Sequence, residues 1–191
     1  MGRWEPGAGG RLREAALALY LERGFEQTMV ADIAERAGVT ARTFFRHFAD
    51  KREVLFDGSS ALEEQALAAL EAAPASTSAL DAIALALDAV VEMIGGDRDF
   101  ARKRQAVIAA NAELRERELI KLASISTALA GGLRLRGVGG PEANLAAETG
   151  VAVYRVAFGR WIDADEEGDL RDAIRESLTQ LRALTAAPTI E

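Results

Sequence analysis

The sequence predicts an all-α protein with about nine helices and no strand. Apolar residues recur three or four positions apart along most of the 191 residues, and no alternating apolar–polar pattern persists. Glycines and prolines divide the chain into stretches of helical length. Together these observations indicate a series of helices joined by short loops.

The first two helices follow a Gly-rich leader at residues 1–10. Apolar residues at positions 12, 15, 16 and 19 predict the first helix, which ends at Gly24. A short stripe over residues 30–37 predicts the second helix, with Thr28 as its N-cap and Gly38 as its stop.

A third helix is expected from Thr40 to just before Asp50. Asp50 and Glu53 have the spacing of a capping box, which predicts that a fourth helix opens here and covers residues 51–73. Because this helix would link the N-terminal helices to the rest of the chain, we expect it to carry any regulatory signal.

Five more helices are predicted after Pro74. Gly95-Gly96 and the segment GVGGP separate some of them, and Pro141 suits the first helical position. DADEEG, at 163–168, is an expected loop, and the tail 185–191 is expected to be loose. The predicted helices cover residues 78–94, 99–109, 113–135, 141–162 and 169–184.

Composition excludes several classes of protein. The chain is 49% apolar and 28% charged, with no cysteine and one histidine, so neither a thiolate nor a multi-histidine metal site is expected. No apolar run reaches the roughly 18 to 20 residues that span a bilayer. Without a phosphate loop, serine elbow or histidine pair, we expect neither an enzyme nor a cofactor. These features favour a cytoplasmic protein without a membrane partner.

Charge is unevenly distributed along the chain. The overall formal charge is −7, yet residues 1–55 carry a net charge of +1 and the remainder carries −8. An acidic body with a near-neutral N-terminal part would bind nucleic acid only through that part.

The third predicted helix has two distinct faces. At 100° per residue, Phe44 and Phe48 share one face, and Arg42 and Arg46 point to the other. The phenylalanines are therefore expected to anchor the helix on the second helix, leaving the arginines for a partner. With Gly38 in a tight turn between two short helices, the pattern is typical of a helix-turn-helix.

In a helix-turn-helix the second helix enters the major groove, where arginines bind guanine edges or phosphates. Hydroxyls and other cations then suit phosphate oxygens. An alternative remains open, in which the basic face is solvated or binds an acidic protein, making the chain an α-helical protein-interaction module. The expected DNA-binding residues are Thr28, Thr40, Arg42, Thr43, Phe45, Arg46, His47 and Lys51.

Residues 11–56 closely resemble the N-terminal domain of the TetR family of bacterial transcriptional regulators. The resemblance lies in "GF" at 24–25, "DIAERAGV" at 32–39, "TFFRHF" at 43–48 and "DK" at 50–51, in the family's order and spacing. The family often has tyrosine where this chain has Phe45, so one hydroxyl contact to phosphate would be lost here.

The resemblance implies a homodimer that binds a palindromic operator on double-stranded DNA, usually as a repressor. It also implies that a small-molecule effector, held in the C-terminal part, releases the DNA. The expected domains are a helix-turn-helix DNA-binding domain at 11–56 and an α-helical ligand-binding and dimerisation domain at 57–184. The sequence identifies neither the effector nor the operator.

The resemblance also implies that the last two long helices, residues 141–184, form the dimer interface. A stripe of apolar and small residues favours this, although a buried central helix in a monomer would show the same pattern. Polar residues on apolar helices are candidates for the effector pocket, or are locally satisfied. The interface candidates are Val151, Arg155, Phe158 and Trp161, and the pocket candidates are Arg104, Asn111, Ser126, Tyr154 and Phe158.

Overall fold

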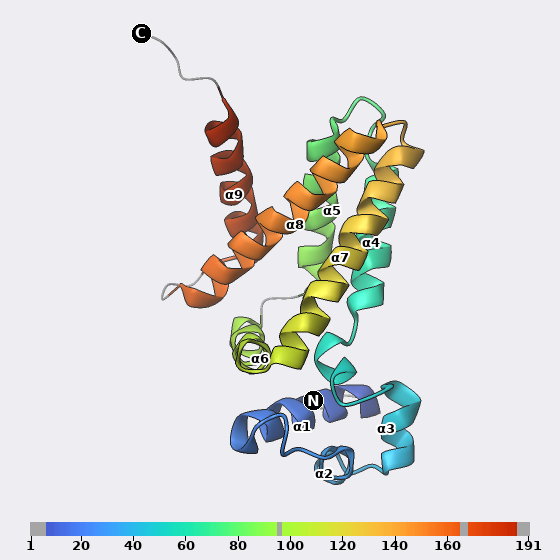
Figure 1. Cartoon of the computed structure of the whole chain (residues 1–191), viewed down its shortest axis with the longest axis vertical. Helices are drawn as coiled ribbons and strands as arrows, with labels where there is room; N and C mark the ends of the chain where they lie inside the picture. Colours follow the sequence, from blue (N-terminus) through green and yellow to red (C-terminus); the bar gives the residue numbers. More distant parts are fainter. Residues whose placement is uncertain (1–6, 95–96, 165–167, 187–191) are drawn as a thin grey trace, which may run out of the picture. The chain divides into compact units, whose positions relative to one another are not determined.

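The computed structural model describes residues 7–94, 97–164 and 168–186, and within them the all-α prediction is confirmed (Figure 1). The leader at 1–6, the loop residues 165–167 and the last residues, 187–191, lie outside the described part. The helices are α1 (Ala8–Arg23), α2 (Val30–Arg36), α3 (Ala41–His47), α4 (Ser59–Ala72), α5 (Ala79–Ile94), α6 (Arg98–Ala110), α7 (Ala112–Leu135), α8 (Gly140–Asp163) and α9 (Leu170–Thr185).

The chain divides into two compact units. The first contains residues 1–59 and 100–120, and the second contains 60–99 and 121–191. The sequence instead suggested one continuous second domain from residue 57. The difference arises because Val107, Ile108 and Leu114, from α6 and the start of α7, belong to the hydrophobic core of the first unit.

The core of the first unit is built on α1. Leu12, Ala16 and Leu19 are buried, as their helical spacing predicts. The helix starts at Ala8, inside the expected leader, and ends at Gly24, whose φ of 89° is a conformation that favours glycine.

The predicted helix 51–73 is wrong: two elements occupy this stretch. A 3₁₀ turn covers Glu53–Phe56, and α4 begins only at Ser59. Asp50 accepts hydrogen bonds from the backbone N–H groups of Arg52 (2.7 Å) and Glu53 (3.2 Å), which opens the 3₁₀ turn rather than an α-helix. Gly58 then turns the chain with a φ of 83°.

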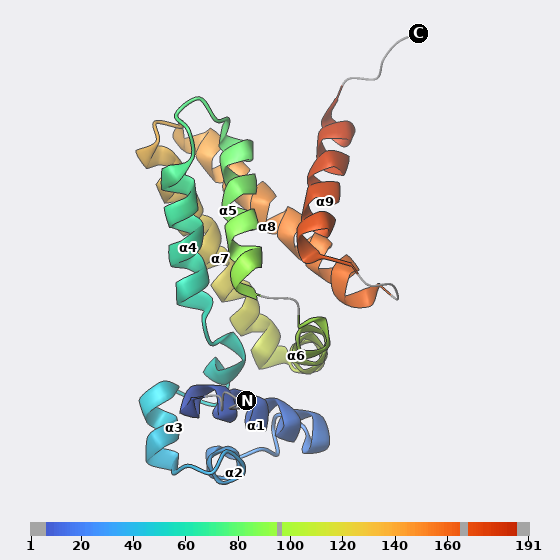
Figure 2. The ribbon, with the colours of Figure 1, turned by 180° about the vertical axis from the view of Figure 1, so that it is seen from behind.

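In the second unit α8 packs against both α5 and α9 (Figure 2). Close contact between helices depends on glycine at two places. A Cβ atom added to Gly150 of α8 would overlap the side chain of Ile83 on α5, and one added to Gly132 of α7 would lie 2.6 Å from Leu70 Cδ2 on α4. None of the described helices is both long and apolar enough to cross a membrane.

Candidate nucleic-acid interface

A tight turn joins α2 to α3. Gly38 has a φ of 67°, the Gly38 N–H donates to Glu35 O (3.0 Å), and the Val39 N–H donates to Ala34 O (2.9 Å). These two bonds form a Schellman motif, which ends α2 and directs the chain into α3. The glycine turn expected between the two short helices is therefore confirmed.

Local hydrogen bonds and buried rings fix the start and the orientation of α3. Thr40 is its N-cap, and the Thr40 hydroxyl accepts from the Thr43 N–H at 3.2 Å. Phe44 and Phe48 are buried in the core of the first unit together with Ile33, and their ring centroids are 5.5 Å apart. The prediction that these phenylalanines anchor the helix is confirmed.

The opposite side of α3 is exposed. Arg42, Arg46 and His47 are all solvent-exposed, and 58% of Phe45 is accessible. Within the described residues, neither the Arg42 nor the Arg46 guanidinium has an ion pair or a hydrogen bond. The helix thus presents two positive charges without a described partner, together with an exposed aromatic ring.

Three nearby arginines of the same unit have carboxylate partners. Arg36 donates to both carboxylate oxygens of Glu22 (2.9 and 2.7 Å), Arg23 lies 3.3 Å from Asp32, and Arg52 lies 2.6 Å from Asp50. The hydrogen bond from Arg52 lowers the pKa of the Asp50 carboxyl, so the pair stays charged at neutral pH. The cations of α3 therefore differ from these neighbours in having no described partner.

Two of the residues expected at DNA have other roles. Thr28 is only 1% exposed, and its hydroxyl donates to Gly24 O at 2.8 Å. Met29, rather than Thr28, is the N-cap of α2. The prediction that Thr28 caps α2 is wrong, and its hydroxyl is used inside the fold instead of facing a phosphate.

Lys51 is the second such residue. Its ammonium group donates to three backbone carbonyls, Phe25 O (2.8 Å), Thr28 O (3.1 Å) and Glu26 O (3.3 Å), and lies 4.3 Å from the centre of the Phe25 ring. An ammonium group has three N–H donors, so these contacts use its full capacity. The sequence predicts that Lys51 binds a phosphate, whereas in the structure its ammonium group faces backbone carbonyls of its own chain.

His47 lies beside the N-terminal part of α1. A Cβ atom added to Gly9 would be 3.5 Å from His47 Nδ1. Thr40 and Thr43 have their hydroxyl oxygens 3.1 Å apart, so the two form one small polar group at the start of α3. Arg42, Phe45, Arg46, His47 and these threonines thus remain together on α3 and its N-cap.

The five pocket candidates are divided between the two units. Arg104 and Asn111 belong to the first unit, where Arg104 Nε donates to Leu55 O (2.6 Å) and Asn111 Nδ2 donates to Val107 O (2.7 Å). The other three belong to the second unit. There Ser126 is buried and donates to Glu148 (2.7 Å), while the Tyr154 and Phe158 rings stack at 5.6 Å.

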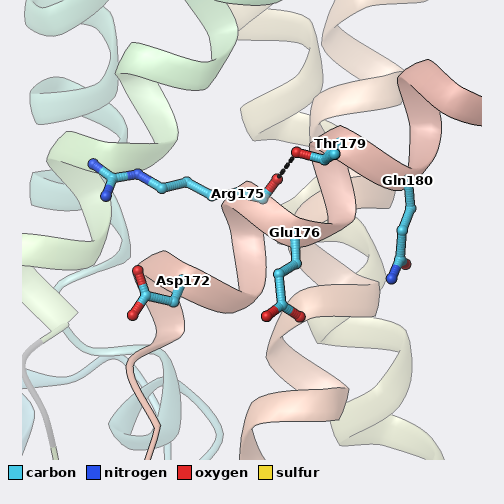
Figure 3. Close-up of a pocket in the computed structure, with 5 residues that line it drawn as sticks. All are labelled: Asp172, Arg175, Glu176, Thr179 and Gln180. Atoms are coloured by element: carbon cyan, nitrogen blue, oxygen red, sulfur yellow. Dashed lines mark hydrogen bonds between the residues drawn. The ribbon is translucent and has the colours of Figure 1, made fainter.

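A surface hollow of about 460 Å³ lies elsewhere, along α9. Its lining comes from that one helix, so it is a groove rather than an enclosed pocket (Figure 3). None of the pocket candidates from the sequence borders it. The lining residues are Asp172, Arg175, Glu176, Thr179 and Gln180.

Among the interface candidates, Trp161 is buried within the chain itself. It is 5% exposed, and its indole N–H donates to Gly168 O at 2.9 Å, which closes the corner between α8 and α9. Trp161 is therefore not available to a second copy. Arg155 is exposed and Val151 and Phe158 are half-buried, but the large exposed apolar residues of α8 and α9 are Leu145, Val156 and Leu184, which sequence reasoning missed.

Two family models match this chain. The model described as "Bacterial regulatory proteins, tetR family" matches residues 12–57, and the "MftR C-terminal domain" model matches residues 77–186, more than half of the chain. The chain belongs to the TetR family. Its N-terminal match covers the helix-turn-helix described above, so the resemblance seen in the sequence is confirmed.

Curated relatives match less than half of this chain. HTH-type transcriptional regulator TcmR of Streptomyces glaucescens is 48% identical over 81 residues, 42% of this chain and 36% of that protein. HTH-type transcriptional repressor KstR2 of Mycobacterium tuberculosis is 44% identical over 46 residues, 24% of this chain and 23% of that protein. The chain thus spans only about a third or less of the length of these relatives.

Solved structures share the whole TetR fold with this chain. FadR of Bacillus subtilis, in complex with stearoyl-CoA, has a TM-score of 0.64 and 22% identity, covering 90% of this chain and 96% of that one. FadR of Thermus thermophilus, in complex with lauroyl-CoA, has a TM-score of 0.57 and 21% identity, covering 96% and 99%. At this identity the likeness concerns the fold alone.

Proposed function

We propose that this TetR-family chain binds a palindromic DNA operator as a homodimer and represses transcription until a small molecule releases it. The observation that carries the proposal is the exposed face of α3, where Arg42 and Arg46 have no described partner. Exposed, unpaired guanidinium groups on the second helix of a helix-turn-helix suit guanine edges and phosphates in the major groove.

The residues of this face have different proposed tasks. Arg42 and Arg46 bind bases or phosphates, and the exposed Phe45 ring packs on a thymine methyl group or the sugar–phosphate backbone. Thr40, Thr43 and His47 are placed for phosphate oxygens at the edges of the contact. Thr28 and Lys51 are left out of this set, because their polar atoms are used within the chain.

Dimerisation is proposed through α8 and α9. Leu145, Val156 and Leu184 expose 70%, 56% and 84% of their surface, which is a large apolar area for two helices of one chain. Val151, Arg155 and Phe158 belong to α8 and remain candidates at the edge of the interface. Two helix-turn-helix units held this way would bind two half-sites about one helical turn apart.

The effector is proposed to be apolar over most of its length. Tyr154 and Phe158 of α8 are half-buried, and their stacked rings offer an apolar surface within the second unit, with the buried Ser126 of α7 as the polar candidate. Two proteins of the same fold hold stearoyl-CoA and lauroyl-CoA, so long-chain acyl-CoA esters are the first compounds to test.

The test is a gel-shift experiment with duplex DNA from the region flanking the protein's own gene, at two salt concentrations. Specific binding that weakens steeply with salt, and is lost on adding an acyl-CoA, supports the proposal. The second candidate function, a helical module whose basic α3 binds an acidic protein, rests on the same two arginines. It is favoured if no duplex binds at low salt.

A further inference from the structure

The segment after α3 and the loop before α2 are joined by one side chain. Lys51 follows α3, and its ammonium group lies among the carbonyl oxygens of residues 25, 26 and 28, which directly precede α2. The N-terminal end of α2 and the C-terminal end of α3 are therefore connected across 23 to 26 residues of sequence.

A second bond holds the same residue from the other side. The Tyr20 hydroxyl of α1 donates to Lys51 O at 2.6 Å, and the Tyr20 and Phe25 rings contact edge to face at 5.2 Å. Burial raises the pKa of the Tyr20 phenol, so it remains a hydrogen-bond donor at any physiological pH. Lys51 thus joins α1, the α1–α2 loop and the end of α3.

We propose that Lys51 is a positioning residue for DNA recognition, which fixes the α2–α3 pair in its DNA-reading geometry without contacting DNA. Three carbonyls and one aromatic face surround its ammonium group, so its charge is already bound inside the protein. Without the ammonium group, the carbonyls of residues 25, 26 and 28 in the α1–α2 loop lose their described hydrogen bonds to the end of α3. The α2–α3 pair can then shift relative to α1. The inference rests on the proposed function, and deepens it by separating a residue that aims the helix from residues that touch DNA.

The experiment compares three full-length variants with wild type. Lys51→Met removes the ammonium group and keeps the aliphatic stem, Arg42→Met removes a proposed DNA contact, and Arg36→Met removes a charge that is already paired with Glu22. Affinity is measured over a range of salt concentrations on a palindromic duplex that the wild-type chain has selected from a random-sequence pool. The temperature is one at which circular dichroism shows every variant fully helical.

For Lys51→Met we expect a Kd raised by about tenfold, comparable to the loss of one base-reading pair, with an unchanged slope of log Kd against log salt. Arg42→Met should also weaken binding, but it should lower that slope by about 0.9 if Arg42 neutralises a phosphate. Arg36→Met should bind as wild type does. In the free protein, Lys51→Met should speed backbone amide exchange in residues 24–29.

Lys51→Arg separates the two possible roles further. A planar guanidinium suits a phosphate well, yet it cannot direct donors at three converging carbonyls while lying over the Phe25 ring. We therefore expect Lys51→Arg to stay impaired. Wild-type affinity in Lys51→Arg, or in fully folded Lys51→Met, would overturn the inference, as would a reduced salt slope in Lys51→Met. If the wild-type chain itself selects no duplex, the proposed function fails, whereas the exchange measurement still reports whether Lys51 holds the loop.

Discussion

The two faces of α3 predict opposite effects of mutation. Arg42 and Arg46 are exposed and have no described partner, so Arg42→Ala or Arg46→Ala removes no intramolecular contact of its charge. Exposed substitutions of this kind usually change the free energy of unfolding by no more than about 0.5 kcal/mol. The same change should weaken operator binding by about 1–3 kcal/mol if the side chain reads a base. Loss of discrimination at one operator position then identifies a base contact, and uniform weakening identifies a phosphate contact.

Phe44 is the matched opposite case. Its side chain is fully buried among Ile33, Phe48 and the other core residues of the first unit. Phe44→Ala should lower the free energy of unfolding by about 3–5 kcal/mol, because it removes buried area and leaves a cavity. Urea denaturation followed by circular dichroism measures this, and fluorescence anisotropy with labelled operator measures affinity. If both arginine variants bind as tightly as wild type, α3 does not present these side chains to DNA and the reasoning is refuted.

The orientation of α3 was predictable because it depends on local information. Phe44 and Phe48 are four residues apart, as are Arg42 and Arg46, so each pair shares one face of the helix. The first face is apolar and the second is cationic. The turn was equally readable, since Gly38 needs a positive φ that other residues rarely adopt. Both features require only a few consecutive residues.

The roles of Thr28 and Lys51 could not be read in the same way. Their partners are backbone carbonyls, which every residue has, and the carbonyls that Lys51 binds lie 23 to 26 positions away. Sequence pattern shows that a lysine is present but not where its charge points. Arg104 is a similar case, because only tertiary structure brings α6 to Leu55 of the first unit.

The start of α4 was missed although a local signal existed. Asp57-Gly58 is a common turn pair, and Gly58 does adopt a positive φ before Ser59 opens the helix. The capping-box spacing of Asp50 and Glu53 outweighed it in the prediction. In the structure, Val54, Leu55 and Phe56 are all buried, and three consecutive buried residues do not fit one face of an α-helix at 100° per residue.

Three further predictions concern the dimer, acid stability and helix packing. Val156→Glu should give a folded monomer in sedimentation velocity, because it places a charge in the proposed interface, whereas Leu135→Glu, at an apolar residue of α7 that is 93% exposed, should leave the dimer intact. The Asp50 carboxyl has a lower pKa in the folded chain than in the unfolded chain, so its ionised form stabilises the fold at any pH above the unfolded-state pKa. That contribution is lost as the pH falls through the folded-state pKa. Asp50→Asn should therefore flatten the fall in unfolding free energy below about pH 4. Gly150→Ala should destabilise the second unit by about 1–3 kcal/mol, because its new methyl group would overlap Ile83, and both helices would have to move apart. Gly159→Ala is the matched control on the same helix: its Cβ meets nothing within 4 Å, so helix propensity alone acts and the change should stabilise by up to about 1 kcal/mol. Equal effects of the two substitutions on the thermal midpoint would show that α5 and α8 do not pack through Gly150.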